Sequence, residues 1–219
     1  MFSTRIVINK YTLSILILVL MMTTSLMAKA ELIVLASPQS NDPYYAKMKN
    51  KIFDFHVNYA KKIIQHGDQV LILTDQSLYN DYVKALGKDH VVIAPMQDIW
   101  MRDFSSSNPK APILFRYTAA GQGGGKKGQL NADAVQAKFK QYVQKAGLKF
   151  TSTNLFNDGG NWVDDGAGHV VVSTKFLSDN NLSENTARKK LMTLTGLKHI
   201  AFIDSDEQGG LEHADGVVS

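Results

Sequence analysis

The sequence has no cysteine, only five prolines and two tryptophans among its 219 residues. Without cysteine the chain can form no disulfide and supplies no thiolate nucleophile of its own. It also has no lysine and arginine stripe interleaved with aromatic residues, which argues against a nucleic-acid partner. What remains is an ordinary composition, 44% hydrophobic and 20% charged, which excludes wholesale disorder and is enough for one packed domain.

The first thirty residues have the pattern of a targeting segment. Basic residues precede an apolar run over 13–22, and the segment ends in the small residues of Ala28-Lys29-Ala30. The apolar run is shorter than the roughly 20 residues that a membrane-spanning helix needs. We therefore expect a signal peptide over 1–30, rather than a membrane anchor, and a mature protein that is exported to the periplasm or secreted.

Strand-like and helix-like patterns alternate along the rest of the chain, which predicts a mixed α/β domain. Helices are expected from Asp42-Pro43 to Gly67, over 78–86, from a cap at Asn131 to 146, and over 183–195. The expected strands are 32–36, 69–74, 90–94, 113–117, 149–153, 170–174 and 199–203. The first helix should bury the stripe Tyr45, Met48, Ile52, Phe55, Tyr59 and Ile63, and a glycine-rich loop should span 121–128.

A short repeat supports a modular architecture. Ala146-Gly147-Leu148-Lys149 and Thr195-Gly196-Leu197-Lys198 stand 49 positions apart, and each is expected to join a helix to a strand. A period of this size indicates a repeated supersecondary unit.

The first segment with chemical potential is Trp100-Met101-Arg102-Asp103. An indole offers a flat face to a planar cation. The carboxylate of Asp103 offers two acceptor oxygens to a guanidinium fork. The segment is equally compatible with a surface turn that holds an Arg–Asp pair and a packed Trp.

The second segment is Asn157-Asp158-Gly159-Gly160-Asn161-Trp162. Paired glycines let a backbone approach a ligand closely or adopt positive φ. Asp158 and Asn161 would place polar groups on either side. A tight turn between strands explains the same residues.

The third segment is His213-Ala214-Asp215-Gly216. In an extended chain His213 and Asp215 point to the same face, which places an imidazole beside a carboxylate and suits general acid–base catalysis. A single exposed histidine in a loop is the alternative. The spacing does not match a zinc ligand set, so we expect no metal site.

In this order the three segments resemble the agmatine deiminase and bacterial peptidylarginine deiminase family, with its W-x-R-D, G-G-N and H-x-D-G motifs. The strand Leu114-Phe115-Arg116-Tyr117 resembles the one that follows W-x-R-D in that family. The resemblance implies a pentein fold, an α/β propeller of five ββαβ units with pseudo-fivefold symmetry. It also implies a covalent cysteine mechanism without a cofactor, in which guanidine groups lose ammonia.

The resemblance also implies roles for individual residues. His213 would be the general acid–base, Asp103 and Asp215 would hold the guanidinium, and Trp100 would flank it. Further substrate contacts would come from Arg116, Asp158, Gly160 and Asn161. Agmatine, peptidyl-arginine and free arginine all remain open as substrates. Asp158 stands where agmatine deiminases tend to have Glu, which leans away from strict agmatine specificity.

In that family the nucleophilic cysteine lies near the C-terminus, after H-x-D-G. We therefore expect residues 31–219 to form a partial pentein domain, about three of five units, that does not turn over substrate. Unpaired strand edges in such a ring would favour pairing with a second copy, so a homo-oligomer is one expected state. Two alternatives stay open: an exported guanidinium- or amine-binding pseudoenzyme, and a structural pentein or interaction module.

Overall fold

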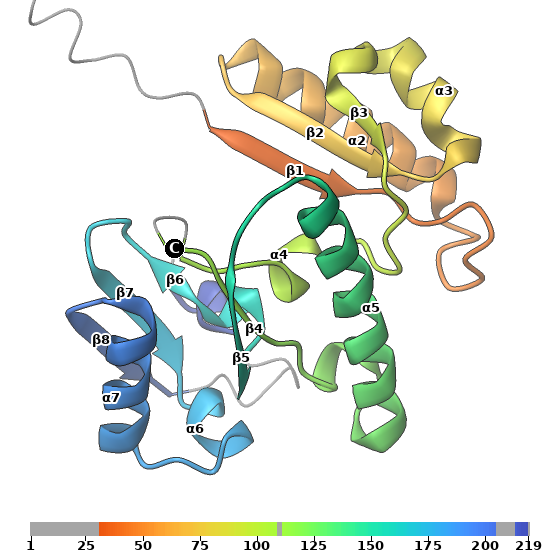
Figure 1. Ribbon diagram of the computed structural model, residues 1–219. Coiled ribbons are helices and arrows are strands. Elements are labelled where there is room, and N and C mark those ends of the chain that lie inside the picture. The colour runs from red at the N-terminus through yellow and green to blue at the C-terminus, as the bar shows by residue number, and fades with distance from the viewer. Residues whose placement is uncertain (1–30, 109–110, 205–212, 219) are drawn as a thin grey trace, which may run out of the picture.

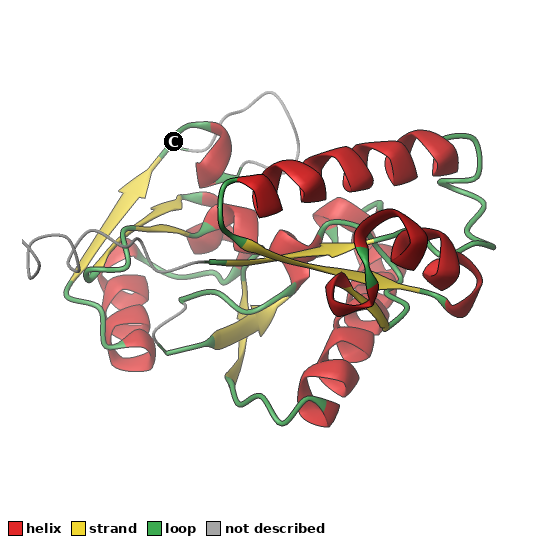
Figure 2. Ribbon diagram, turned by 90° about the horizontal axis from the view of Figure 1, so that it is seen from above, coloured by secondary structure: helices red, strands yellow, loops and turns green. Residues whose placement is uncertain are grey.

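The computed structural model describes residues 31–108, 111–204 and 213–218, so the expected signal peptide lies outside the described residues. Within these ranges the chain forms three small sheets, in the orders β1-β2-β3, β4-β5 and β6-β7-β8 (Figure 1). No helix in the described ranges is long and apolar enough to cross a membrane. The strands run through the middle of the molecule with helices on either side (Figure 2).

The elements follow one another as β1 (Leu32–Ala36), α2 (Lys49–Gln65), β2 (Gln69–Thr74), α3 (Gln76–Leu86), η1 (Lys88–His90), β3 (Val91–Ile93), α4 (Met101–Phe104), β4 (Ile113–Arg116), η2 (Ala120–Gln122), α5 (Gly125–Lys145), β5 (Thr151–Phe156), η3 (Gly159–Asn161), β6 (Val163–Asp164), β7 (His169–Ser173), α6 (Lys175–Asp179), α7 (Glu184–Thr195), β8 (His199–Ile203) and η4 (Ala214–Gly216). This alternation confirms the predicted mixed α/β class.

Each sheet contains a pair of parallel strands that are connected by one or two helices. Helix α2 connects β1 to β2, α5 lies between β4 and β5, and α6 and α7 connect β7 to β8. We call these three units the first, second and third modules. The repeated joint found in the sequence lies where it was predicted, because Gly147 and Gly196 follow α5 and α7 with left-handed φ of 71° and 70°. A glycine adopts this conformation at little steric cost, so it ends each helix before the next strand.

Strand β4 links the second module to both of its neighbours. Leu114 belongs to the apolar cluster that also holds Ala36 and Leu73 of the first module. Ile113 and Phe115 point the other way, into the cluster built on the third module. Because both faces of β4 are buried, the three modules are fixed relative to one another, and so are the loops that follow their strands.

The prediction for the first helix was wrong in its start and, except for Ile63, in most of its buried face. Helix α2 begins at Lys49, because the side chain of Asp42 accepts a hydrogen bond from the amide of Tyr44 and caps a turn instead. The buried side consists of His56, Val57, Ala60 and Ile63. Phe55 and Tyr59 of the predicted stripe are 60% and 42% exposed. The helix carries apolar residues on two sides, and the side that includes Ala60 packs into the cluster that holds Ile72 of β2.

The glycine-rich segment is also helical for much of its length. Helix α5 starts at Gly125 and not after Asn131, since Gly123 and Gly124 complete the turn with φ of 87° and 74°. Gly128 is buried in the first turns, where an added Cβ would lie 3.0 Å from the carbonyl oxygens of Ala119 and Gln122. The expected loop is therefore mostly a helix start, and Gly128 allows close packing there.

Candidate functional site

Three short turns meet near the middle of the molecule. Turn α4 follows β3, η3 follows β5, and η4 lies beyond β8; α4 contacts η3, and η3 contacts η4 (Figure 1). In open parallel sheets, ligands bind outside the carboxyl ends of the strands. These turns carry the four residues Asp103, Asp158, His213 and Asp215, which we call the carboxylate–imidazole cluster.

The imidazole of His213 lies between two carboxylates. Its Nε2 is 3.2 Å from Oδ2 of Asp158, and its Nδ1 is 3.8 Å from Oδ1 of Asp103. The side chains of His213 and Asp103 are only 12% and 14% exposed. His213 and Asp158 are close enough to form a hydrogen bond. Asp103 is too far for a direct hydrogen bond to His213 but close enough for a strong electrostatic interaction.

This environment shifts the proton affinity of both groups. Burial raises the pKa of Asp103 to about 6; the charge of His213 and the backbone amide of Gly160 oppose the rise, and the charges of Asp158 and Asp215 add to it. For His213, burial acts to lower the pKa. The hydrogen bond to Asp158 and the surrounding carboxylate charges outweigh it, so the pKa is raised. Perturbed titratable groups of this kind are typical of functional sites.

Asp158 is held in place by Thr118, a residue that the sequence patterns did not single out. The amide and the hydroxyl of Thr118 donate to its two oxygens at 2.8 and 2.7 Å. Together with His213 these donors satisfy a carboxylate whose side chain is only 2% exposed. Asp158 is thereby positioned to fix the orientation of the imidazole. The only sequence signal for Thr118 is that it follows a buried strand.

The paired glycines permit close contacts inside the protein. A Cβ on Gly159 would lie 1.8 Å from the carbonyl oxygen of Arg102, and a Cβ on Gly160 would lie 2.3 Å from Nδ1 of His213. Neither distance is sterically allowed, so η3 can press against α4 and His213 only because both positions lack side chains. Neither glycine needs positive φ for this, because neither is among the residues with positive φ.

His213 and Asp215 are not neighbours on one extended face. Residues Ala214–Gly216 form the 3₁₀ turn η4, with His213 as its N-cap, so the segment is not an extended strand. Asp215 instead receives a hydrogen bond from Nε of Arg102 at 2.9 Å. The sequence suggested an Arg–Asp pair within the first segment. The structure instead pairs Arg102 of α4 with Asp215 of η4.

The remaining predicted residues fall into two groups. Trp100 is 60% exposed and lies at the start of α4, next to the cluster in sequence. Arg116 and Asn161 have partners elsewhere: the guanidinium of Arg116 is bonded to Asp133 at 3.0 and 2.7 Å. The side-chain amide of Asn161 joins Asn157 to the backbone of Ser173. The structure therefore brings Asp103, Asp158, Gly160, His213 and Asp215 together, and gives Asn161 an internal bracing position.

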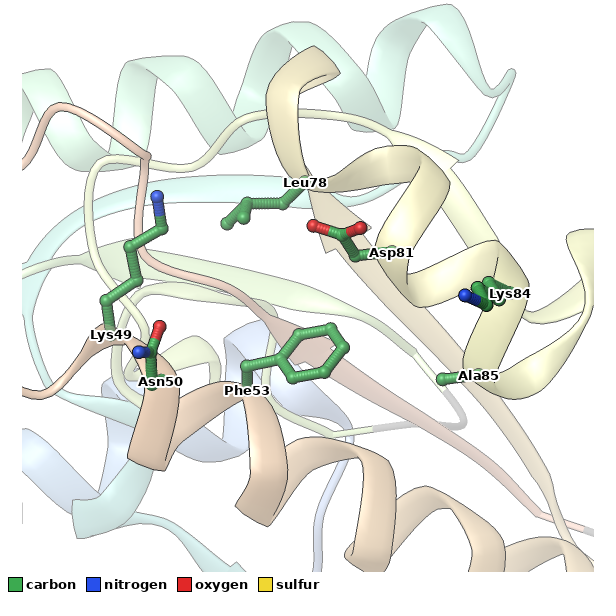
Figure 3. A pocket seen from close by; sticks show the side chains of 7 residues that line it. All are labelled: Lys49, Asn50, Phe53, Leu78, Asp81, Lys84 and Ala85. Carbon is green, nitrogen blue, oxygen red and sulfur yellow. The ribbon is translucent and has the colours of Figure 1, made fainter.

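One further feature, a cavity, lies apart from the cluster. A cavity of about 450 Å³ opens between α2 and α3, lined by Phe53 and Leu78 with Lys49, Asp81 and Lys84 at its edge (Figure 3). It shares no residue with the cluster. Among the described residues no group of three or more His, Asp or Glu side chains is arranged to hold a metal ion.

Comparison with known proteins gives a family and a fold. The family model of the Porphyromonas-type peptidyl-arginine deiminases matches residues 25–218. A search of the curated proteins found no match.

Solved structures with the same fold include two agmatine deiminases. That of C. jejuni has a TM-score of 0.63 at 19% identity, covering 81% of this chain and 54% of its own. That of Enterococcus faecalis has a TM-score of 0.59 at 18% identity, covering 85% and 54%. At such identities the likeness shows the α/β fold alone. The present chain spans about half the length of these proteins.

Proposed function

The chain belongs to the Porphyromonas-type peptidyl-arginine deiminase family, and we propose that its carboxylate–imidazole cluster binds the guanidinium group of agmatine or of peptidyl-arginine. The observation that carries the proposal is the geometry of His213. Its imidazole lies between Asp158 at 3.2 Å and Asp103 at 3.8 Å, and both carboxylates are largely buried. Several acids around one site leave a negative charge that a planar cation can neutralise.

The electrostatics of Asp103 favour a cationic ligand in particular. Burial raises the pKa of this acid to about 6, so its ionised form is costly without a cationic partner. A guanidinium supplies the missing positive charge together with forked N–H donors that match carboxylate oxygens. In the proposal Asp215 is the second acceptor, and the exposed indole of Trp100 offers a flat face to the cation.

The reaction class proposed for the family site is deimination. A thiolate adds to the guanidinium carbon, one C–N bond breaks, and ammonia leaves with a proton from His213; water then cleaves the thiouronium to a ureido product and regenerates the thiolate. Since the 219 residues include no cysteine, we assign guanidinium binding, without turnover, to this polypeptide. His213, with its raised pKa, is suited to the protonation step.

We also propose a propeller arrangement of the modules and export of the protein. The three modules each repeat a parallel strand pair and a helix, which supports a propeller arrangement of pentein type. The pattern of residues 1–30 supports export. N-terminal sequencing of periplasmic or secreted material should begin at Glu31, and an intact Met1 in a soluble cytoplasmic pool would contradict export.

Titration calorimetry tests the binding proposal directly. Agmatine and N-acetyl-arginine methylamide should bind the 219-residue protein at pH 7.5, whereas putrescine, which has amines but no guanidine group, should not. Asp103→Asn and Asp215→Asn should each weaken agmatine binding at least tenfold, and Asp179→Asn on α6 should not. Equal binding of putrescine and agmatine, or clear ammonia release from agmatine by this polypeptide, would refute the assignment.

A further inference from the structure

We infer that Arg102 is a positioning residue, which holds Asp215 in the orientation that receives the guanidinium. The inference rests on the proposed function and adds to it a residue outside the group that touches the ligand. Arg102 immediately precedes Asp103, yet its side chain points to Asp215, 113 positions further along the chain.

Arg102 contacts all three turns of the site. It is part of α4. Its Nη2 donates to the carbonyl oxygen of Trp162, the residue that ends η3, at 3.1 Å. Its Nε donates to Oδ2 of Asp215 in η4 at 2.9 Å. Its own carbonyl oxygen is pressed against Gly159, where a Cβ would lie at 1.8 Å. One residue thus ties together the segments that bear Asp103, Asp158 and His213.

The contact is suited to orientation more than to stability. The side chains of Arg102 and Asp215 are 57% and 35% exposed, and ion pairs in such positions contribute little to folding. The bond from Arg102 uses Oδ2 of Asp215, which leaves the other oxygen to accept a ligand N–H. Only a guanidinium has separate, fixed N–H donors that can reach a carbonyl and a carboxylate at once, so lysine cannot reproduce both bonds.

Arg102 could also have the opposite role, that of a competitor of the ligand, and the experiment must exclude it. The guanidinium of Arg102 carries the same chemical group as the ligand and occupies a carboxylate of the cluster. If it competed with the ligand for Asp215, its removal would tighten binding. If it positions Asp215, its removal weakens binding.

Agmatine calorimetry on a set of variants separates these roles. Arg102→Met should weaken binding at least tenfold, and Arg102→Lys should recover part of the loss. Arg188→Met is the matched control, because Arg188 also pairs with an acid, Glu184, but on the outer helix α7; it should bind as the unchanged protein does. The double variant Arg102→Met/Asp215→Asn should bind no more weakly than Asp215→Asn alone, since Arg102 acts through that acid. Unchanged or tighter binding by Arg102→Met, or additive losses in the double variant, would overturn the inference.

A measurement without ligand keeps the two proposals apart. In the ligand-free protein, a crystal structure of Arg102→Met should show the carboxylate of Asp215 displaced from the place where Nε of Arg102 holds it. Arg188→Met should leave that carboxylate in place. If the unchanged protein fails to bind agmatine, the proposed function fails; if Asp215 keeps its orientation in Arg102→Met, the positioning role fails whether or not agmatine binds.

Discussion

Replacing Asp103 with asparagine should stabilise the fold while it abolishes guanidinium binding. The pKa of Asp103 in the folded state is about 6, above its ordinary value of 3.8. Between these two pH values the folded protein keeps a proton that the unfolded chain has lost, so stability falls as the pH rises through this window. The difference of about 2 in pKa corresponds to about 3 kcal/mol once the acid is fully ionised in both states.

Asparagine resembles the protonated acid and carries no charge to bury. Because it cannot reproduce every contact of the acid, we expect Asp103→Asn to raise the free energy of unfolding by about 1 to 2 kcal/mol at pH 7.5, which is part of that 3 kcal/mol. At pH 4.5 most of Asp103 is protonated in the folded state, and the gain should be less than half as large.

Urea unfolding at both pH values, followed by circular dichroism, measures this difference. Asp179→Asn, which removes an acid paired with Lys175 on α6, is the control and should not stabilise the protein at either pH. The reasoning would be refuted if Asp103→Asn were destabilising at pH 7.5, or if its effect were the same at pH 4.5. A stability gain combined with lost agmatine binding would mark Asp103 as a residue kept for the site at the expense of the fold.

Three further outcomes follow from the same geometry. Gly160→Ala would place a Cβ 2.3 Å from Nδ1 of His213, so agmatine binding should fall at least tenfold in calorimetry, whereas Gly166→Ala in the loop before β7 should leave binding unchanged. Agmatine affinity should rise as the pH passes through about 6, because the ligand binds the ionised form of Asp103; an affinity that is flat from pH 5 to 7.5 would contradict this. Thr118→Val removes the 2.7 Å hydroxyl bond to buried Asp158 and should lower the free energy of unfolding by about 1 to 3 kcal/mol, measured by urea unfolding; an unchanged value would contradict the anchoring role.

The regular elements were predictable where a local signal determines them. Strands 32–36, 69–74 and 199–203 lie where short apolar runs are bounded by turn residues. Helix α7 begins after Ser183, whose hydroxyl accepts from the amide of Thr186, and ends at Gly196. In each case the residues that decide the boundary lie within the element or next to it.

The predictions were wrong or incomplete where the structure depends on residues that lie far away in the sequence. Nothing within α2 tells which of its two apolar sides will meet the sheet, since its partners, such as Val70 and Ile72 of β2, lie outside the helix. The glycines of η3 were open to interpretation as a turn, because their function depends on Arg102 and His213 in two other segments. Thr118 and the pairing of Arg102 with Asp215 could not be predicted from spacing, since 40 and 113 positions separate the partners.

The charge of the assembled site explains why these distant groups belong together. Three carboxylates, Asp103, Asp158 and Asp215, face one imidazole and one guanidinium, that of Arg102. When His213 is protonated and the acids are ionised, the sum is one negative charge; when His213 is neutral, it is two. Burial, together with the charges of Asp158 and Asp215, raises the pKa of Asp103, so the ionised form of this acid is costly unless an opposite charge enters. A ligand that carries one positive charge and several N–H donors relieves it, and a neutral or anionic ligand does not.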